Sequence, residues 1–173
     1  NIKDKLISQN QLSGKLFGLP IAIKDLTPIN GMPTTSGSLL EKDHIADSDN
    51  LLYERIKKHG PVILGKTNTP EFGLMGHTEN LLKDHCRNPW DNDKTSGGSS
   101  GGAGSAVAAG FCSIAMGGDA GGSIRIPSSY NGIFGIKPTQ GRIPRRGFPA
   151  HNLISQDGPM TRYVEDSALI LEI

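Results

Sequence analysis

Residues 97–123 read GGSSGGAGSAVAAGFCSIAMGGDAGGS, a run of small and apolar residues bounded by two glycine clusters. Residues 100–111 have the length of a helix and are almost all small, which is typical of a helix packed tightly against its neighbours. Residues 113–116 then predict a strand. Clustered glycine indicates a backbone that passes close to another group or adopts dihedral angles that other residues avoid. Because apolar segments flank both clusters, we do not interpret them as flexible linkers.

The segments on either side alternate between strand-like and helix-like patterns. Residues 16–23 (LFGLPIAI) predict a strand that delivers Lys24 and Asp25 at its end. Residues 50–59 predict a helix, with the side-chain oxygens of residues 47–49 available to cap it. The other expected elements are a strand over 61–64, a helical turn over 70–74, a helix over 123–130, a strand over 133–136 and a helix from 164. Strands that alternate with helices favour an α/β fold with a largely buried sheet.

The composition argues against several classes of function. Charge is nearly balanced, with 18 Lys and Arg against 17 Asp and Glu, so no attraction to nucleic acid or to an anionic membrane is expected. The one basic run, Arg142, Arg145 and Arg146, is interpreted as a solvated loop. Cys86 and Cys112 are compatible with one disulfide, but no pattern requires it. No apolar run has the length of a membrane span and the N-terminus lacks a secretory signal, so a cytoplasmic location is expected.

The two ends of the sequence indicate a piece of a longer chain. The sequence opens on Asn1 rather than on Met. Residues 164–173 form a capped helical pattern that stops without a Gly or Pro signal. We therefore expect residues 1–173 to form a single domain that is truncated.

One segment matches a nucleotide-binding motif without the context that the motif needs. Residues 60–67 (GPVILGKT) fit the phosphate-cradling pattern G-x-x-x-x-G-K-[ST]. That mechanism requires an open glycine-rich loop between a strand and a helix. Here the intervening residues are themselves the predicted strand, and Pro70 follows closely. Nucleotide binding is therefore disfavoured.

A second motif is compatible with an esterase of the α/β-hydrolase type. The pattern G-x-S-x-G occurs twice in residues 97–102, centred on Ser99 or on Ser100. In that fold the serine follows an apolar strand, whereas residues 88–95 are polar. His151 is the only histidine downstream. An esterase that depends on His151 is the runner-up interpretation.

The remaining histidines do not indicate a metal site. His77, His85 and Cys86 are close in sequence, but no further ligand stands at a metal-binding spacing. We interpret these residues as parts of a loop and expect no metal.

The second glycine cluster, residues 117–122, precedes a serine that begins a predicted helix. A run of small residues there brings several backbone N–H groups to the edge of Ser123, together with the positive end of the helix dipole. Such donors are what an oxyanion hole requires. A tight turn with Ser123 as an ordinary helix cap explains the same pattern equally well. The cluster alone does not decide between the two.

The combination of motifs resembles the amidase signature family, whose members cleave C–N amide bonds. The resemblance rests on Lys24-Asp25 after a strand, on residues 97–102 and on GGSIRIP at residues 121–127. It extends from about Gly18 to the last residue, and the paired serine clusters are highly specific. Further matching segments are residues 65–68, 88–90, 135–142 and 158–162. The resemblance implies an α/β fold with a mixed sheet covered by helices, and a reaction on a small-molecule amide without metal or cofactor.

The resemblance also implies a role for each residue of a Ser–Ser–Lys triad. Ser123 would be the nucleophile that attacks the amide carbonyl. Ser99 would bridge Ser123 and Lys24 and would follow a cis peptide bond after Gly98. Lys24, as a neutral amine, would be the base. We expect the three side chains to form a chain of hydrogen bonds, with Asp25 on the opposite side of the strand.

Further residues are assigned to the loop around the nucleophile by the same resemblance. The backbone N–H groups of Ala120, Gly121, Gly122 and Ser123 would form the oxyanion hole. The positions that match supporting residues of the family are Ser100, Asp119 and Arg125. Asp119 and Arg125 are expected to brace the loop electrostatically.

The remaining expectations concern the parent protein and the isolated chain. The tRNA-dependent amidotransferase subunits of the family usually carry glutamine where Ile126 stands, which disfavours, without excluding, that function. A catalytically silent fragment that pairs with a missing C-terminal part, or self-associates, is a further alternative. If the chain is a fragment, we expect it to be inactive or nearly so. Lys24 would then be more exposed than in an intact enzyme, and its pKa would move back toward that of free lysine.

Overall fold

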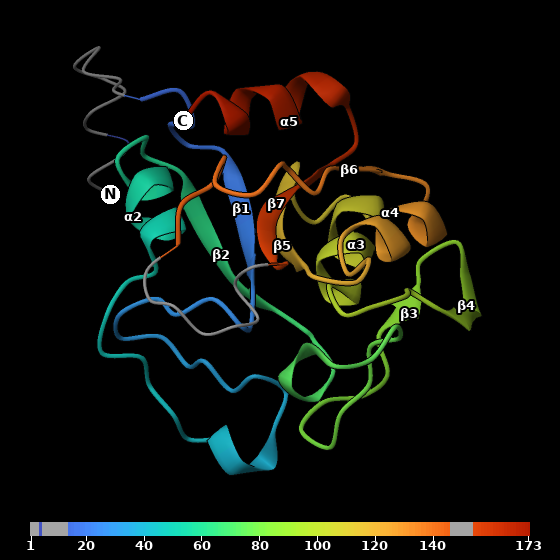
Figure 1. Cartoon of the computed structure of the whole chain (residues 1–173). Coiled ribbons are helices and arrows are strands. Elements are labelled where there is room, and N and C mark those ends of the chain that lie inside the picture. Colours follow the sequence, from blue (N-terminus) through green and yellow to red (C-terminus); the bar gives the residue numbers. More distant parts are fainter. Residues whose placement is uncertain (1–3, 5–13, 146–153) are drawn as a thin grey trace.

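The computed structural model describes Asp4 and residues 14–145 and 154–173, and its centre is a five-stranded sheet (Figure 1). The strand order is β2-β1-β5-β7-β6. Strands β2, β1 and β5 run parallel, whereas β7 is antiparallel to both β5 and β6. The strands are β1 (Pro20–Lys24), β2 (Val62–Thr67), β5 (Ile114–Asp119), β6 (Phe134–Gly135) and β7 (Gln156–Thr161). The predicted α/β class with a mixed sheet is confirmed.

Helices cover both faces of this sheet (Figure 1). The helices are α2 (Leu51–Lys57), α3 (Gly101–Ala108), α4 (Arg125–Asn131) and α5 (Val164–Leu171). Two short 3₁₀ helices, Leu39–Glu41 and Glu71–Gly73, lie in the connections. A separate hairpin is formed by β3 (Arg87–Asn88) and β4 (Asp91–Thr95).

The central strands bury large side chains on one face and small ones on the other. Ile21 and Ile23 of β1 belong to the core under α2 and α5. Ala22, which lies between them in the strand, belongs to the core that includes α3. Strand β5 repeats the pattern, with Ala115 on the α3 side. Because successive side chains of a strand alternate between faces, Lys24 follows Ala22 onto the small-residue face.

The small residues of α3 allow it to lie close to the rest of the molecule, as the composition predicts. A Cβ atom on Gly102 would stand 2.4 Å from the backbone nitrogen of Asn68, so no larger residue fits there. Ala103 and Val107 of the same helix are fully buried in the core with Ala115. The glycines of the first cluster therefore allow the backbone of α3 to lie against the backbone at Asn68.

The structure differs from the sequence-based expectations at several elements, one of which is the β3–β4 hairpin in the stretch expected to be a polar loop. Strand β2 extends to Thr67, so Lys66 of the nucleotide-motif match lies within a strand, and no open phosphate-binding loop exists there. Helix α2 is capped by Asn50, whose side chain accepts a hydrogen bond from the backbone of Leu52, and not by residues 47–49. Strand β7 was not predicted, because Gly158 and Pro159 interrupt any alternating pattern.

The cysteines and the helix lengths can also be compared with the sequence. Cys86 and Cys112 are both free thiols, so the optional disulfide is absent from the described residues. Within the same residues, no helix is long and apolar enough to cross a membrane.

Candidate active site

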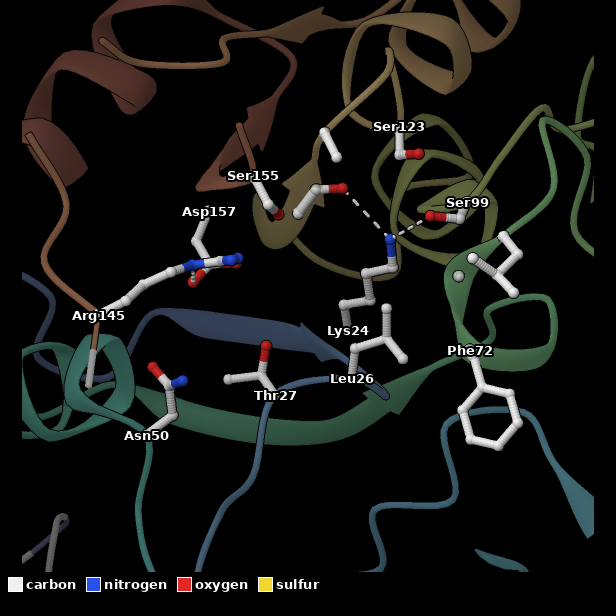
Figure 2. A pocket seen from close by; sticks show the side chains of 14 residues that line it. Lys24, Leu26, Thr27, Asn50, Phe72, Ser99, Ser123, Arg145, Ser155 and Asp157 are labelled. Atoms are coloured by element: carbon white, nitrogen blue, oxygen red, sulfur yellow. Dashed lines mark hydrogen bonds and ion pairs between the residues drawn. The ribbon is translucent and has the colours of Figure 1, made fainter. Parts of the chain in front are cut away.

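Lys24 ends β1 on the small-residue face and is almost completely buried. Its side chain is 2% exposed. The Nζ atom donates to Ser99 Oγ at 2.6 Å and to the carbonyl oxygen of Gly118 at 3.3 Å (Figure 2). The first of the two predicted hydrogen bonds of the triad is therefore present.

Ser99 is positioned by the first glycine cluster. The Gly98–Ser99 peptide bond is cis, as the resemblance implies. A Cβ atom on Gly98 would stand 2.7 Å from the backbone of His77, so this backbone segment has no room for a side chain. Helix α3 begins two residues after Ser99, and Ser99 itself is 2% exposed.

Ser123 lies beside the same cavity but is not hydrogen-bonded to Ser99. The two glycine clusters are tied together because the N–H of Ser100 donates to the carbonyl oxygen of Ser123 at 3.1 Å. Figure 2 shows the hydroxyls of Ser99 and Ser123 on neighbouring walls of the cavity. The second predicted hydrogen bond, between these hydroxyls, is not formed among the described residues, so the prediction of a continuous chain was wrong for this link.

Ser123 is also not a helix cap. Helix α4 begins at Arg125 and its N-terminal cap position is Ile124; the N–H of Arg125 donates to the Asp119 carboxylate at 3.3 Å and not to the Ser123 hydroxyl. The alternative that Ser123 serves only as a capping residue thus has no contact to support it. Its hydroxyl is left available on the cavity side.

The cavity around these residues has a volume of about 590 Å³. One part of its wall is apolar and includes Leu26, Phe72 and Leu74. The opposite part is polar (Figure 2). The polar wall includes Thr27, Asn50, Arg145, Ser155 and Asp157. Lys24, Ser99 and Ser123 lie between the two parts.

The pKa of Lys24 is far below that of an exposed lysine. Burial lowers this pKa from 10.5 to about 7, against the opposing influence of the Asp157 and Asp119 carboxylates, and Arg145 lowers it further. The expectation that truncation exposes Lys24 and moves its pKa back toward that of free lysine is therefore wrong. The reason is that the glycine-rich segments of this chain cover the amine from both sides.

Asp25 does not oppose this effect, because its side chain lies elsewhere. Its carboxylate accepts hydrogen bonds from Thr35, including one of 3.2 Å from the backbone nitrogen, and forms an ion pair of 3.2 Å with Lys66. The expectation that Asp25 turns away from Lys24 is confirmed.

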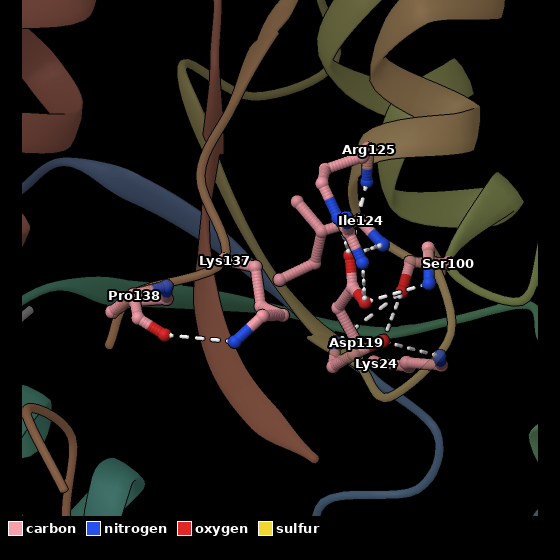
Figure 3. A network of polar contacts seen from close by, with 9 residues as sticks. Lys24, Ser100, Asp119, Ile124, Arg125, Lys137 and Pro138 are labelled. Atoms are coloured by element: carbon pink, nitrogen blue, oxygen red, sulfur yellow. Dashed lines mark hydrogen bonds and ion pairs between the residues drawn. The ribbon is translucent and has the colours of Figure 1, made fainter. Parts of the chain in front are cut away.

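A buried carboxylate organises the loop that carries Ser123. Asp119 is fully buried at the end of β5. It accepts two hydrogen bonds from the Arg125 guanidinium, at 2.9 and 3.0 Å (Figure 3). It also accepts from the backbone N–H of Gly122 at 2.7 Å and of Ile124 at 3.1 Å. The expectation that Asp119 and Arg125 brace the loop is confirmed.

The same contacts bear on one of the residues expected in the oxyanion hole. The N–H of Gly122 donates to Asp119 Oδ1 at 2.7 Å in this structure. Burial raises the pKa of Asp119, but the hydrogen bonds from Arg125 and from the backbone lower it more, to about 2. The carboxylate is therefore charged at every pH near neutrality and holds the Gly122 donor in the loop.

Replacement of Asp119 by alanine is expected to destabilise the full-length protein by about 3–5 kcal/mol. The change leaves buried backbone donors without an acceptor, each at a cost of about 1–3 kcal/mol. The measurement is the midpoint of thermal unfolding, with Asp43→Ala as a control, because Asp43 has only a 3.9 Å ion pair with Lys42 at the surface. Equal midpoints for the two variants would contradict the bracing role.

Ser100 has a structural position next to Ser99. It is fully buried, and its hydroxyl lies 3.3 Å from both the backbone nitrogen and the carbonyl oxygen of Gly118. Gly118 in turn accepts from Lys24. Ser100 therefore supports the strand that contacts Lys24, in agreement with its expected supporting position.

The metal-site and esterase interpretations both depend on histidine residues. His77 and His85 contact the Glu79 carboxylate at 3.2 and 2.8 Å on an exposed loop. No group of His, Cys, Asp and Glu side chains suited to a metal ion occurs within the part of the chain that the structure describes. His151, required by the esterase alternative, lies outside the described residues.

Two residues of the site were not predicted from the sequence. Arg145 was interpreted as part of a solvated basic loop, but its side chain is only 20% exposed and is paired with Asp157. That interpretation was wrong for Arg145. Of the same run, Arg142 is exposed and donates to the carbonyl oxygen of Leu171, and Arg146 lies outside the described residues. The only sequence signal for Asp157 was its place next to the matching segment 158–162.

Comparison with known proteins gives a consistent result. The family model described as Amidase matches residues 2–173. The chain is 48% identical over 161 residues to the A subunit of the glutamyl-tRNA(Gln) amidotransferase of Saccharolobus solfataricus, covering 92% of this chain and 34% of that protein. It is also 48% identical over 178 residues to the indoleacetamide hydrolase of Bradyrhizobium diazoefficiens, covering 98% of this chain and 34% of that protein.

The fold agrees with solved structures of similar sequence. The structure of a 6-aminohexanoate cyclic dimer hydrolase complexed with substrate superposes with a TM-score of 0.89 at 38% identity. The match covers 96% of this chain and 36% of that one. The chain thus spans about a third of the length of the relatives that it matches.

Proposed function

Because the chain belongs to the amidase signature family, we propose that the full-length protein carrying it hydrolyses amide bonds through an acyl-serine intermediate. The observation that carries the proposal is the buried contact of 2.6 Å between Lys24 Nζ and Ser99 Oγ, beside a cavity that Ser123 also lines. A serine hydroxyl is a weak nucleophile without a base, and lysine is a known substitute for histidine in this role.

The proposed reaction begins with a proton transfer along the triad. Neutral Lys24 accepts the proton of Ser99, and Ser99 accepts the proton of Ser123 as the Ser123 oxygen attacks the substrate carbonyl. This step needs the two serine hydroxyls to come into hydrogen-bond contact when substrate is bound, since catalytic hydrogen bonds often tighten only in the substrate complex. Return of a proton to the departing amine breaks the C–N bond. Water then hydrolyses the acyl-serine ester by the same route.

The negative oxygen of the tetrahedral intermediate would be stabilised by backbone donors of the loop before α4. Because the N–H of Gly122 donates to Asp119, the oxyanion would be bound by the N–H groups of Ala120, Gly121 and Ser123. Backbone donors fixed in advance stabilise such charge without reorganisation, and one donor is worth about 3–4 kcal/mol.

The shape of the cavity supports a class of substrate. The apolar wall formed by Leu26, Phe72 and Leu74 would bind a hydrocarbon or aromatic group, and the polar wall near Asn50 would bind a hydrogen-bonding group. We therefore propose a small-molecule amide with one apolar and one polar end. Protein outside this chain, or a second copy, would close the cavity.

The proposal is tested by the pH dependence of kcat/KM of the full-length protein on an aryl amide. Lys24 must be neutral to act as a base, and its pKa is about 7. The rate is therefore expected to rise with pH through about 7 and to level off above it, with a tenfold fall for each pH unit well below the pKa. A flat profile between about pH 5.5 and 8.5 would contradict a lysine base with this pKa.

The amidotransferase alternative is retained because one relative of 48% identity belongs to such an enzyme. In this chain Ile126 stands where those proteins usually have glutamine. The Ile126 side chain lies next to Gly97 and Gly122. The two functions are separated by comparing glutamine with aryl amides as substrates. Activity confined to glutamine would favour the amidotransferase function.

A further inference from the structure

We propose that Arg145 and Asp157 are positioning residues for Lys24, in which Arg145 holds and neutralises the Asp157 carboxylate so that this carboxylate does not keep the amine protonated. The inference rests on the proposed role of Lys24 as a base. It concerns an ion pair on the polar wall of the cavity, about which the sequence motifs say nothing (Figure 2).

Asp157 lies directly across the sheet from the group that contacts Lys24. In the pairing of β5 with β7, Asp157 stands opposite Gly118. Gly118 accepts a hydrogen bond from Lys24 through its carbonyl oxygen, at 3.3 Å. A Cβ atom on Gly118 would be 3.1 Å from Asp157 Oδ1, so the carboxylate packs against this glycine. The Asp157 carboxylate is thus buried, with Asp157 only 5% exposed, and only Gly118 lies between it and the Lys24 amine.

Arg145 engages both oxygens of that carboxylate. Arg145 Nε donates to Asp157 Oδ2 at 3.0 Å, and a guanidinium nitrogen donates to Oδ1. A two-point contact of this kind fixes the orientation of the carboxylate as well as its charge. Figure 2 shows the tip of Lys24 between this ion pair and Ser99. The arrangement gives Lys24 a neighbouring pair with no net charge in place of a single anion.

The other charged groups around Lys24 are already paired with one another. Asp119 of β5 is held by Arg125. On the neighbouring strand β2, Lys66 is paired with Asp25. The Asp157 carboxylate raises the pKa of Lys24 more than Asp119 does, and Arg145 lowers it. Because Asp157 has the larger influence of the two carboxylates, a single substitution in the Arg145–Asp157 pair is expected to change the charge beside the amine most.

The test compares two variants of the full-length protein that each remove one charge of the pair, of opposite sign. Arg145→Gln leaves Asp157 unpaired, so the titration midpoint of Lys24 is expected to move up by about 1 pH unit or more. Asp157→Asn leaves a positive charge, so the midpoint is expected to move down by a similar amount. Arg145→Lys, which keeps the positive charge, is expected to restore most of the wild-type midpoint.

Two readouts separate this inference from the proposed function. The first is the NMR titration of Lys24 in protein labelled with ¹³C at the lysine ε carbon, assigned by the signal that Lys24→Arg removes. The second is the acid limb of kcat/KM on an aryl amide. Opposite shifts in the NMR titration support the ion-pair inference even if no amide is cleaved. Amide cleavage with an unmoved Lys24 titration overturns the inference and leaves the proposed function standing.

A matched control comes from the same segment. Arg142 is exposed and contacts α5 rather than the cavity, so Arg142→Gln is expected to leave the Lys24 midpoint within experimental error. Thermal unfolding of each variant identifies any protein that has not folded. If Arg145→Gln does not fold, the comparison of Asp157→Asn with Arg145→Lys carries the test, because only the former is expected to lower the Lys24 midpoint. Shifts of the same sign in Arg145→Gln and Asp157→Asn would mean that the pair acts only as a structural support, and would overturn the inference.

Discussion

Replacement of Ser123 by alanine in the full-length protein is expected to reduce amide hydrolysis by about 10⁴-fold or more, since loss of a serine nucleophile removes the covalent route altogether. The same variant should no longer be labelled by phosphonates that react with active serines. Ser123 is the one serine that borders the cavity from the loop organised by Asp119. The measurements are kcat/KM on an aryl amide and the mass of the labelled protein.

Two other serines serve as controls for that experiment. Ser129→Ala removes an exposed hydroxyl from α4, the helix that follows Ser123, and should change neither activity nor labelling. Ser100→Ala removes a buried supporting hydroxyl and should have a far smaller effect than Ser123→Ala. Equal labelling of wild type and Ser123→Ala would move the nucleophile to the first glycine cluster and revive the esterase interpretation.

Replacement of Lys24 by methionine is expected to lower kcat by about 10²–10⁴-fold, the usual contribution of a positioned general base. Lys24→Arg should be equally inactive, because arginine is always protonated and cannot accept the proton of Ser99. Lys24 is the only lysine on the cavity wall among the described residues. Both variants should also react more slowly with phosphonates, since Ser123 would lack its route for proton removal.

The control for Lys24 is Lys58→Met, which removes an exposed lysine after α2. Its kcat should equal that of the wild-type protein. Full activity of Lys24→Arg would show that positive charge and not proton transfer is what the site requires, and the proposed mechanism would fail.

Much of the site could be predicted from local sequence. The alternation of Ile21, Ala22 and Ile23 identifies a buried strand, and its end places Lys24 at the edge of the sheet. The small residues of α3 required a close neighbour, and the structure supplies one in Asn68. These features depend on the periodicity and size of adjacent residues, which a sequence displays directly.

The rest of the site depends on pairs that are distant in sequence. Gly158 and Pro159 hide the strand character of β7, although Asp157 of this strand faces the Lys24 region. Arg145 belongs to a basic run that resembles a solvated loop, and only its three-dimensional partner shows that it is not solvated. Likewise, nothing in residues 117–122 indicates that the Gly122 donor is taken by Asp119. Side-chain pairing of this kind follows from the fold and not from composition.

The division of β1 into a large-residue face and a small-residue face limits how its length can change. A strand presents alternate residues to opposite faces, so deletion of one residue before Lys24 would move Lys24 into the position of Ile23 and Asp25 into the position of Lys24. The lysine would then enter the isoleucine core, and an acid would replace the amine in the cavity. The sheet does contain a register shift, but it stands in β2, where Leu64 lies between the residues paired with Ile21 and Ala22. Length variation among descendants of this protein should therefore be tolerated in the edge strand and eliminated from the central one.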